Sequence, residues 1–131
     1  LVPHEGDWRA AGVTREAESL NAPMFAEALN AEEKGRYREW SPFGVTTDGC
    51  DVQVSAINRS LDGQRLIVRL FESSGGRGTA RLRWNLPVRS VAGVDLLERP
   101  LAECGTTHKD DVTTLALRPF EIVTLAVTVS R

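Results

Sequence analysis

The feature that most constrains the fold is a change in the period of the apolar residues near residue 45. Beyond it, apolar and polar residues alternate in short runs, as where Val52, Val54 and Ala56 alternate with Gln53 and Ser55. A period of two is that of a strand with one face buried. The runs are separated by Gly, Pro, Asp and Asn, which favour turns. The sequence therefore predicts β-structure from residue 45 to the end of the chain.

Six short strands follow from this pattern, over residues 52–56, 66–71, 79–84, 91–97, 112–117 and 122–129. The second is apolar on both faces except at Arg69, which predicts a central strand of a sheet. The Gly-rich stretch 73–78 is predicted to be a flexible hairpin loop and the stretch 105–111 a polar loop. Short strands with turns about every 8 to 12 residues predict an antiparallel β-sandwich.

Residues 1–44 do not continue this pattern. Val13, Ala17 and Leu20 recur at helical spacing, and the residues before Pro23 end the period, which predicts a short helix. The charged stretch 27–39 predicts either a second short helix or an ordered connection. We therefore expect an all-β protein with two parts. Residues 1–44 form an N-terminal segment of strand end, short helix and linker, and residues 45–131 form the β-sandwich.

Composition excludes several classes of partner. Of the 131 residues, 41% are hydrophobic and 26% are charged, as in a globular domain. The formal net charge is −2 and Lys and Arg are scattered, so no nucleic acid is expected, because its binding needs a basic stripe. No apolar run approaches the ~20 residues of a membrane span, so no membrane partner is expected. Cys50 and Cys104 are predicted to be free thiols of a reducing compartment.

Four short segments of the sequence are informative when they are considered together. They are PHEGDWR at 3–9, LIVRLFE at 66–72, DLLERP at 95–100 and RPFEIVTL at 118–125. In this order and at these separations they resemble the C-terminal end of bacterial glycoside hydrolase family 38, the α-mannosidases. The resemblance covers most of the chain and is weakest over residues 25–40. It implies a β-domain that packs against a catalytic domain and braces it.

For the parent enzyme, the resemblance implies hydrolysis of α-mannosidic bonds with retention of configuration. Such an enzyme uses a carboxylate nucleophile, a second carboxylate as acid/base and, in this family, a zinc ion. The resemblance places these groups far upstream, so it implies no catalytic, cofactor-binding or metal-binding residue in this chain. The implied partners are the parent's catalytic domain and, for the parent, a mannose-containing glycan. A bacterial cytoplasmic location is expected, and a secreted one is the alternative.

One cluster near the N-terminus, formed by His4, Glu5, Asp7 and Trp8, is a candidate for the domain interface or the rim of the catalytic pocket. Imidazole and carboxylate groups bind zinc, but a site needs at least three converging ligands. Adjacent residues of an extended segment point to opposite sides, so His4 and Glu5 do not converge easily. Structural hydrogen bonding is the preferred interpretation, and a contact with the catalytic domain is the alternative.

Arg69 is a second candidate for the domain interface. A charge within an apolar strand must find a partner or reach water, because an unpaired buried charge costs several kcal/mol. The carboxylates of Glu72, Glu98 and Glu121 all lie at predicted strand ends. A structural Arg–Glu pair within the sandwich is therefore expected, and contact with the missing domain is the alternative.

Two other functions are open to a sandwich of this kind. A carbohydrate-binding module would expose aromatic rings on one surface, and the residues to consider are Trp8, Tyr37, Trp40, Phe43 and Trp84. Trp84 is in phase with Leu82 and is expected in the core. A protein-binding sandwich domain would need no exposed apolar patch, whereas the tail of an enzyme should expose one near the N-terminus.

Overall fold

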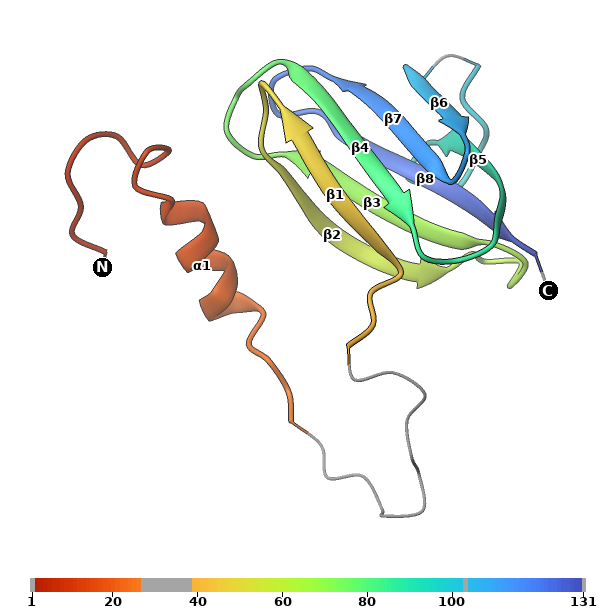
Figure 1. Cartoon of the computed structure of the whole chain (residues 1–131), viewed down its shortest axis with the longest axis horizontal. Helices are drawn as coiled ribbons and strands as arrows, with labels where there is room; N and C mark the ends of the chain where they lie inside the picture. The colour runs from red at the N-terminus through yellow and green to blue at the C-terminus, as the bar shows by residue number, and fades with distance from the viewer. Residues whose placement is uncertain (1, 27–38, 103, 131) are drawn as a thin grey trace. The chain divides into compact units, whose positions relative to one another are not determined.

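The computed structural model describes residues 2–26, 39–102 and 104–130. The chain divides into two compact units, residues 1–40 and 41–131. The first contains the helix α1 (Val13–Asn21), which lies where the sequence predicted it (Figure 1), and none of its residues is buried. The prediction for 27–39 falls, except for its last residue, outside the described residues. Within the described part of the chain, no helix is long and apolar enough to cross a membrane.

The second unit is a sandwich of two four-stranded antiparallel sheets, which confirms the predicted fold class (Figure 1). In sheet A the strand order is β1 (Phe43–Asp48), β4 (Gly78–Trp84), β7 (Val112–Leu117) and β6 (Thr106–Lys109). In sheet B it is β2 (Val52–Arg59), β3 (Leu66–Glu72), β8 (Ile122–Val129) and β5 (Val88–Val94). The strand that was predicted to be central, β3, lies between β2 and β8.

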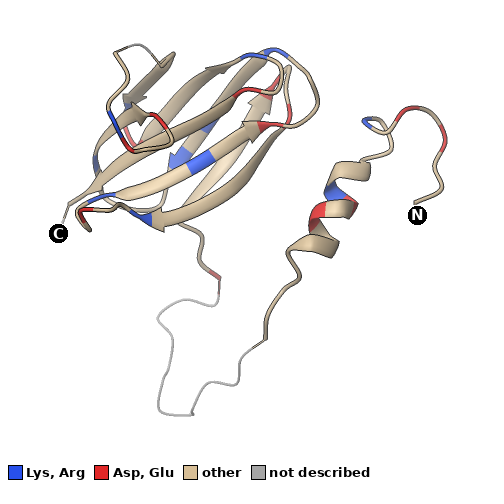
Figure 2. Ribbon diagram, turned by 180° about the vertical axis from the view of Figure 1, so that it is seen from behind, with Lys and Arg blue, Asp and Glu red and all other residues tan. Residues whose placement is uncertain are grey.

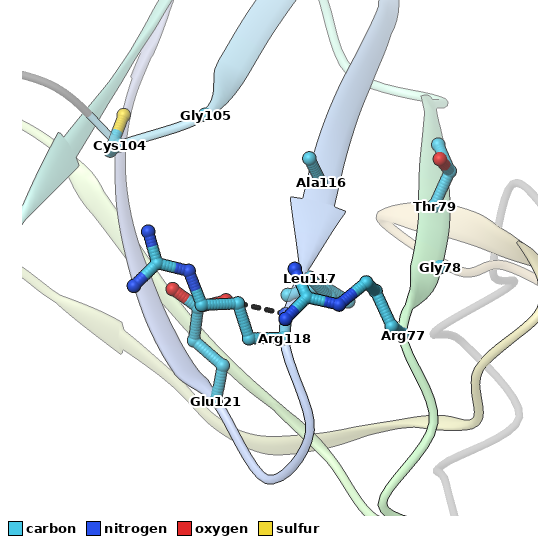
Figure 3. A pocket seen from close by; sticks show the side chains of 9 residues that line it. All are labelled: Arg77, Gly78, Thr79, Cys104, Gly105, Ala116, Leu117, Arg118 and Glu121. Atoms are coloured by element: carbon cyan, nitrogen blue, oxygen red, sulfur yellow. Dashed lines mark hydrogen bonds between the residues drawn. The ribbon is translucent and has the colours of Figure 1, made fainter.

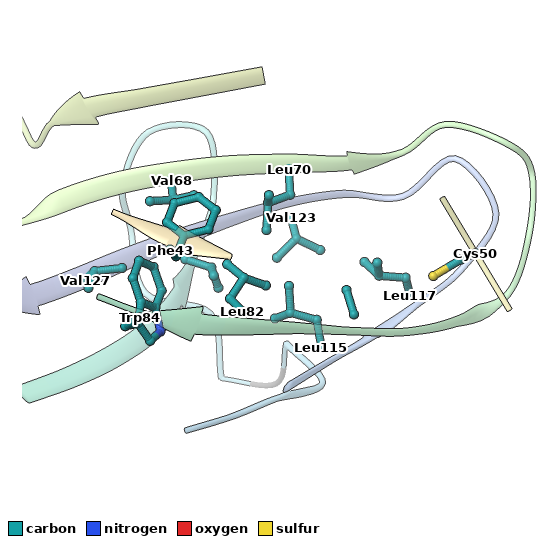
Figure 4. Close-up of a cluster of buried hydrophobic side chains, with 12 residues drawn as sticks. Phe43, Cys50, Val68, Leu70, Leu82, Trp84, Leu115, Leu117, Val123 and Val127 are labelled. Carbon is teal, nitrogen blue, oxygen red and sulfur yellow. The ribbon is translucent and has the colours of Figure 1, made fainter. Parts of the chain in front are cut away.

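The core lies between the inner faces of the two sheets (Figure 4). Because residues alternate along a strand, Val68 and Leu70 of β3 both point inward, and both are fully buried. Phe43 and Trp84 are cross-strand neighbours that pack edge to face, with ring centroids 5.0 Å apart. Each large apolar side chain buried in this way contributes ~1.5–3 kcal/mol. The core also includes Cys50, Ala80, Leu82, Leu115, Leu117, Val123, Leu125 and Val127.

Thr113 is a polar residue within this core, and its hydroxyl group is satisfied. The indole Nε1–H of Trp84 donates to Thr113 Oγ1 at 2.8 Å, and Nδ1 of His108 lies 3.0 Å from the same oxygen. A buried polar group without such partners would cost about 1–3 kcal/mol. Among the described residues, no buried side-chain nitrogen or oxygen lacks a hydrogen-bond partner.

Two strands, β1 and β6, are absent from the sequence prediction. β1 begins at Phe43, so its first two residues lie in the segment that was assigned to the N-terminal region. β6 consists of Thr, Thr, His and Lys, and it lies within the stretch 105–111 that was predicted to be a polar loop. Both are edge strands of sheet A. An edge strand is held by backbone hydrogen bonds to one neighbour and does not need the apolar alternation on which the prediction depended.

The Gly-rich stretch at 73–77 is not a hairpin, because it connects β3 of sheet B to β4 of sheet A. Glycines in this stretch and at the start of β4 allow two backbone segments to approach closely. A Cβ atom on Gly76 would lie 2.6 Å from the carbonyl oxygen of Gly49, and one on Gly78 would overlap the carbonyl oxygen of Asp48. The connection is therefore closely packed against the β1–β2 turn.

The strand predicted over 91–97 ends earlier, because β5 stops at Val94. The carboxylate of Asp95 turns the chain by accepting hydrogen bonds from the backbone N–H groups of Leu97 and Arg99, both at 2.9 Å. Leu96 and Leu97 are consequently exposed rather than part of the strand.

Both cysteines are free, as predicted.

Candidate docking surface

The outer face of sheet B changes in character along its two central strands. Three cross-strand pairs of β3 and β8 line it, namely Ile67 with Ala126, Arg69 with Thr124 and Phe71 with Ile122. The first pair is buried in a small apolar cluster together with Val94. The third pair has no such cover, and Ile122 is 60% exposed. The face thus ends in an apolar region that is open to solvent.

This open region forms the outer-face groove, a hollow of about 300 Å³ lined by Ser55, Arg69, Phe71, Glu72, Ser73, Phe120 and Ile122. Phe120 belongs to the turn between β7 and β8 and is 61% exposed. Large apolar side chains that gather in an exposed hollow are typical of a surface that contacts another molecule. The groove is therefore the candidate functional site of the sandwich.

Arg69 lies in this groove, half-buried. Its Nε–H donates to Thr124 Oγ1 at 3.3 Å. Within residues 2–26, 39–102 and 104–130, the ion pairs join other residues, and no carboxylate pairs with Arg69. The predicted Arg–Glu pair was therefore wrong, and each of the three proposed glutamates has other partners.

Glu72 is 1% exposed and holds the β3–β4 connection and the β7–β8 turn together. Its Oε2 accepts hydrogen bonds from the backbone N–H groups of Gly75 at 2.7 Å and Phe120 at 3.0 Å. Its Oε1 accepts from the N–H of Ser74 at 3.0 Å and from the hydroxyl of the same residue at 2.6 Å. Burial would raise the pKa of the Glu72 carboxyl, but the hydrogen bonds from Phe120 and Ser74 outweigh it and lower that pKa to about 2. At neutral pH, Glu72 is thus a charged hydrogen-bond acceptor that joins the β3–β4 connection to the β7–β8 turn.

Glu98 and Glu121 also bind backbone N–H groups. A carboxylate oxygen of Glu98 accepts from the N–H of Leu61 at 3.0 Å, which ties the turn after β5 to the loop between β2 and β3. Oε2 of Glu121 accepts from the N–H of Arg118 at 2.7 Å, which closes the β7–β8 turn. Sequence reasoning missed these roles, because the type of residue does not show whether a carboxylate faces a side chain or a backbone amide.

A second hollow, the end pocket, is lined in part by Arg118 and Glu121 of the β7–β8 turn (Figure 3). It measures about 730 Å³, and Arg77, Arg118 and Glu121 are its charged lining residues. Figure 3 shows these three charged side chains among the residues that line the pocket. With two cations and one anion, this pocket suits polar contacts at the rim of an interface, whereas the outer-face groove supplies apolar contacts.

Charged residues elsewhere on the sandwich do not gather by sign. Figure 2 shows Lys and Arg interspersed with Asp and Glu over its strands and loops. A continuous basic stripe of the kind that tracks a phosphate backbone is not seen on the sandwich in this view.

His4, Glu5, Asp7 and Trp8 belong to the first unit, and all four are exposed. Oδ1 of Asp7 accepts hydrogen bonds from the backbone N–H groups of Arg9 at 2.9 Å and Ala10 at 2.8 Å. The bond from Ala10 is the main cause that lowers the pKa of this carboxyl. The guanidinium of Arg9 lies 5.0 Å from the centroid of the Trp8 ring, a cation–π contact. Asp7 therefore organises the turn that precedes α1.

Three apolar side chains of the first unit are largely exposed, and whether they form the apolar patch that was predicted near the N-terminus stays a prediction. Leu20, Met24 and Phe25 are 81%, 99% and 95% exposed. Of the aromatic residues considered for sugar binding, Trp8 and Trp40 are exposed in the first unit. Phe43 and Trp84 are buried in the core, and Tyr37 lies outside the described residues.

The described residues show no grouping of three or more His, Cys, Asp or Glu side chains that could hold a metal ion. The donors present in these parts of the chain therefore do not fit a zinc site. What the arrangement offers chemically is a surface for contact, made of an apolar groove with one cation and a charged pocket beside it.

Comparison with known proteins gives an independent result. A family profile described as "Glycosyl hydrolases family 38 C-terminal beta sandwich domain" matches residues 51–125. "Alpha-mannosidase 2C1" of Homo sapiens is 33% identical over 126 residues, which cover 95% of this chain and 12% of that protein. "Alpha-mannosidase G" of Dictyostelium discoideum is 26% identical over 127 residues, which cover 95% of this chain and 11% of that protein. No solved structure matched the chain.

Proposed function

Because this chain belongs to the family of glycosyl hydrolase family 38 C-terminal β-sandwich domains, we propose that it acts as a non-catalytic domain that packs against and braces the catalytic domain of an α-mannosidase. The chain spans about 12% of the length of the first curated α-mannosidases that it matches. The observation that carries the proposal is the outer-face groove, where Phe120 and Ile122 are each about 60% exposed beside Phe71.

An exposed apolar groove with a charged rim has the composition of an interface between domains. Burial of Phe120 and Ile122 against a second domain would contribute roughly 1.5–3 kcal/mol for each side chain, by removing apolar area from water. The Glu72 hydrogen bond to Phe120 holds the turn in place before docking. The groove therefore needs little rearrangement to receive a partner.

In this proposal the chemistry belongs to the partner domain. α-Mannoside hydrolysis with retention of configuration needs two carboxylates about 5–5.5 Å apart across the sugar. A zinc ion would supply charge stabilisation at the sugar hydroxyls, and the donors of the described residues do not fit it. The contribution of this chain is to hold the catalytic domain and the loops around its pocket in shape. A cytoplasmic location, in line with the two free cysteines, is part of the same proposal.

Reconstitution from two chains tests the proposal. The catalytic region of the same enzyme is expressed without these residues and mixed with the 131-residue chain, zinc and a chromogenic α-mannoside. We expect the two chains to co-elute and the activity to rise on mixing. The double substitution Phe120→Asp and Ile122→Asp should lower that activity at least about tenfold, because two charges would have to be buried.

The matched control is Leu61→Asp, which places one charge on a side chain that is 88% exposed and outside the groove. It should leave the activity unchanged. If the wild-type chain neither co-elutes with the catalytic region nor changes its activity, the bracing role is wrong.

A further inference from the structure

We infer that the outer-face groove selects an apolar segment that carries a carboxylate, and that Arg69 is the residue that recognises the carboxylate. The inference rests on the proposed function for the source of that segment, which is the catalytic domain of the α-mannosidase. It adds the chemistry of the partner's contact, which the family membership does not supply.

Arg69 has unused hydrogen-bonding capacity. A guanidinium group carries five N–H donors in a planar fork and no acceptor. Among the described residues, only Nε–H of Arg69 has a side-chain partner, the hydroxyl of Thr124 at 3.3 Å. The two terminal nitrogens of a guanidinium can bind both oxygens of a carboxylate in a bidentate manner. Arg69 is therefore available for a second, stronger partner.

Glu72, the anion in the lining of the groove, is not the partner of Arg69. Both carboxylate oxygens of Glu72 are engaged by the N–H groups of Ser74, Gly75 and Phe120. Glu72 and Arg69 belong to the same strand and form no ion pair, although both line the groove. The positive charge of Arg69 is consequently not neutralised by a neighbour within the described sandwich.

When an occupant fills the groove, it displaces the water around the Arg69 guanidinium, which then needs another hydrogen-bond acceptor. While the groove is open, water solvates the half-buried guanidinium, and its charge is tolerated. A purely apolar occupant would remove that water and leave a buried cation without a partner, which is costly. An occupant that brings a carboxylate to Arg69 replaces the water with a charge-assisted pair. Arg69 thus favours carboxylate-bearing segments and disfavours segments that are apolar throughout.

The groove also defines the surroundings of that carboxylate. Phe71, Phe120 and Ile122 supply apolar contacts, and Ser55 and Ser73 are the small polar residues in its lining. The matching occupant is an Asp or Glu side chain flanked by apolar side chains. This makes Arg69 a specificity-determining residue of the docking surface, while Phe120 and Ile122 provide contact area.

The inference is tested on the 131-residue chain alone, with 3-phenylpropionate as the probe and its neutral amide, 3-phenylpropanamide, as the comparison. Both probes carry the same phenyl ring and differ at the group that would meet Arg69. Binding is followed by backbone amide NMR at constant ionic strength. We expect both to shift the amide resonances of Phe71, Phe120 and Ile122, and the acid to bind about fivefold more tightly or better, as a charge-assisted hydrogen bond implies.

Substitutions of Arg69 test whether this residue causes the preference for the acid over the amide. Arg69→Gln should lower the affinity for the acid to that for the amide, and Arg69→Lys should keep part of the difference, because a point charge replaces the fork. The control is Arg81→Gln, which removes an exposed arginine of sheet A. If the wild-type chain binds acid and amide equally, or if Arg69→Gln leaves the preference intact while the chain stays folded, the inference is overturned.

The outcomes separate this inference from the proposed function. A clear preference for the acid without any association with the α-mannosidase catalytic region would contradict the bracing role and leave the groove's carboxylate preference standing. Association without any preference for the acid would contradict the role of Arg69 and leave the bracing role standing.

Discussion

The carboxylate of Glu72, at the end of β3, accepts a hydrogen bond at 3.0 Å from the backbone N–H of Phe120, which lies 48 residues further along the chain. This contact joins two of the sequence segments that resemble the α-mannosidases, residues 66–72 and 118–125. It fixes the β7–β8 turn, and thereby the exposed ring of Phe120, relative to the centre of sheet B.

Substitution of Glu72 by Gln should destabilise the sandwich by about 2–3 kcal/mol, because an amide N–H₂ group would face backbone N–H groups that need an acceptor. Urea denaturation monitored by tryptophan fluorescence measures the change. The control is Asp110→Asn, an exposed position in the β6–β7 turn, which should change stability by less than about 0.5 kcal/mol. Equal effects of the two substitutions would contradict the role of Glu72.

Protonation of Glu72 should make the free energy of unfolding depend on pH in the acid range. Its pKa is about 2 in the folded chain, below the usual value of 4.5 for a glutamate side chain. The stabilisation is therefore fully present above about pH 5 and is lost as the pH falls toward 2, with a magnitude of roughly 2 kcal/mol. Denaturation at a series of pH values measures it. The slope in this range should be smaller in Glu72→Gln, and an unchanged slope would assign the effect to other carboxylates.

Gly78→Ala should destabilise the fold by about 3 kcal/mol or prevent folding, because the new Cβ would overlap the carbonyl oxygen of Asp48. Gly44→Ala is the matched control, since a Cβ at Gly44 would meet nothing within 4 Å. Thermal denaturation of both variants gives the comparison. A stable Gly78→Ala would show that the close approach of the two loops is not required.

Thr113→Val should cost about 1–3 kcal/mol, because the indole N–H of Trp84 would lose its buried acceptor. Hydrogen exchange of the Trp84 indole N–H, followed by NMR, provides a direct measurement and should become faster. Thr114→Val, on the neighbouring residue of β7, should have a small effect. Unchanged exchange in Thr113→Val would mean that this hydrogen bond does not protect the indole.

Phe120 adopts a left-handed backbone conformation, with a φ of 58°. A side chain there is strained by roughly 1–2 kcal/mol, so Phe120→Gly should leave the fold as stable or increase its stability by up to about 1 kcal/mol. The same substitution should weaken docking, because the ring is lost. Phe120→Ala, which keeps the strain and loses the ring, is the comparison. A large loss of stability in Phe120→Gly would show that the ring supports the sandwich itself.

The sandwich was predictable because strands with one buried face impose a period of two, as Ala80, Leu82 and Trp84 show in β4. The edge strands β1 and β6 could not be predicted from this period. β6 (Thr106–Lys109), for example, is defined by its pairing with β7 and has no apolar pattern of its own. Arg69 was identifiable as a special residue because a charge interrupts an apolar run. The groove around it was not, because its lining joins residues that are distant in sequence, such as Ser55 and Phe120.

The order of strands in sheet B has a consequence for synthesis of the protein. β8 is the last described strand in the sequence, yet it lies between β3 and β5. A ribosome therefore releases both neighbours before the strand that joins them, and their edges stay unpaired until β8 emerges. Unpaired edges promote association between chains. Slow translation or premature termination before residue 122 should thus increase dependence on chaperones, although the other described strands and most of the described core residues would already be made.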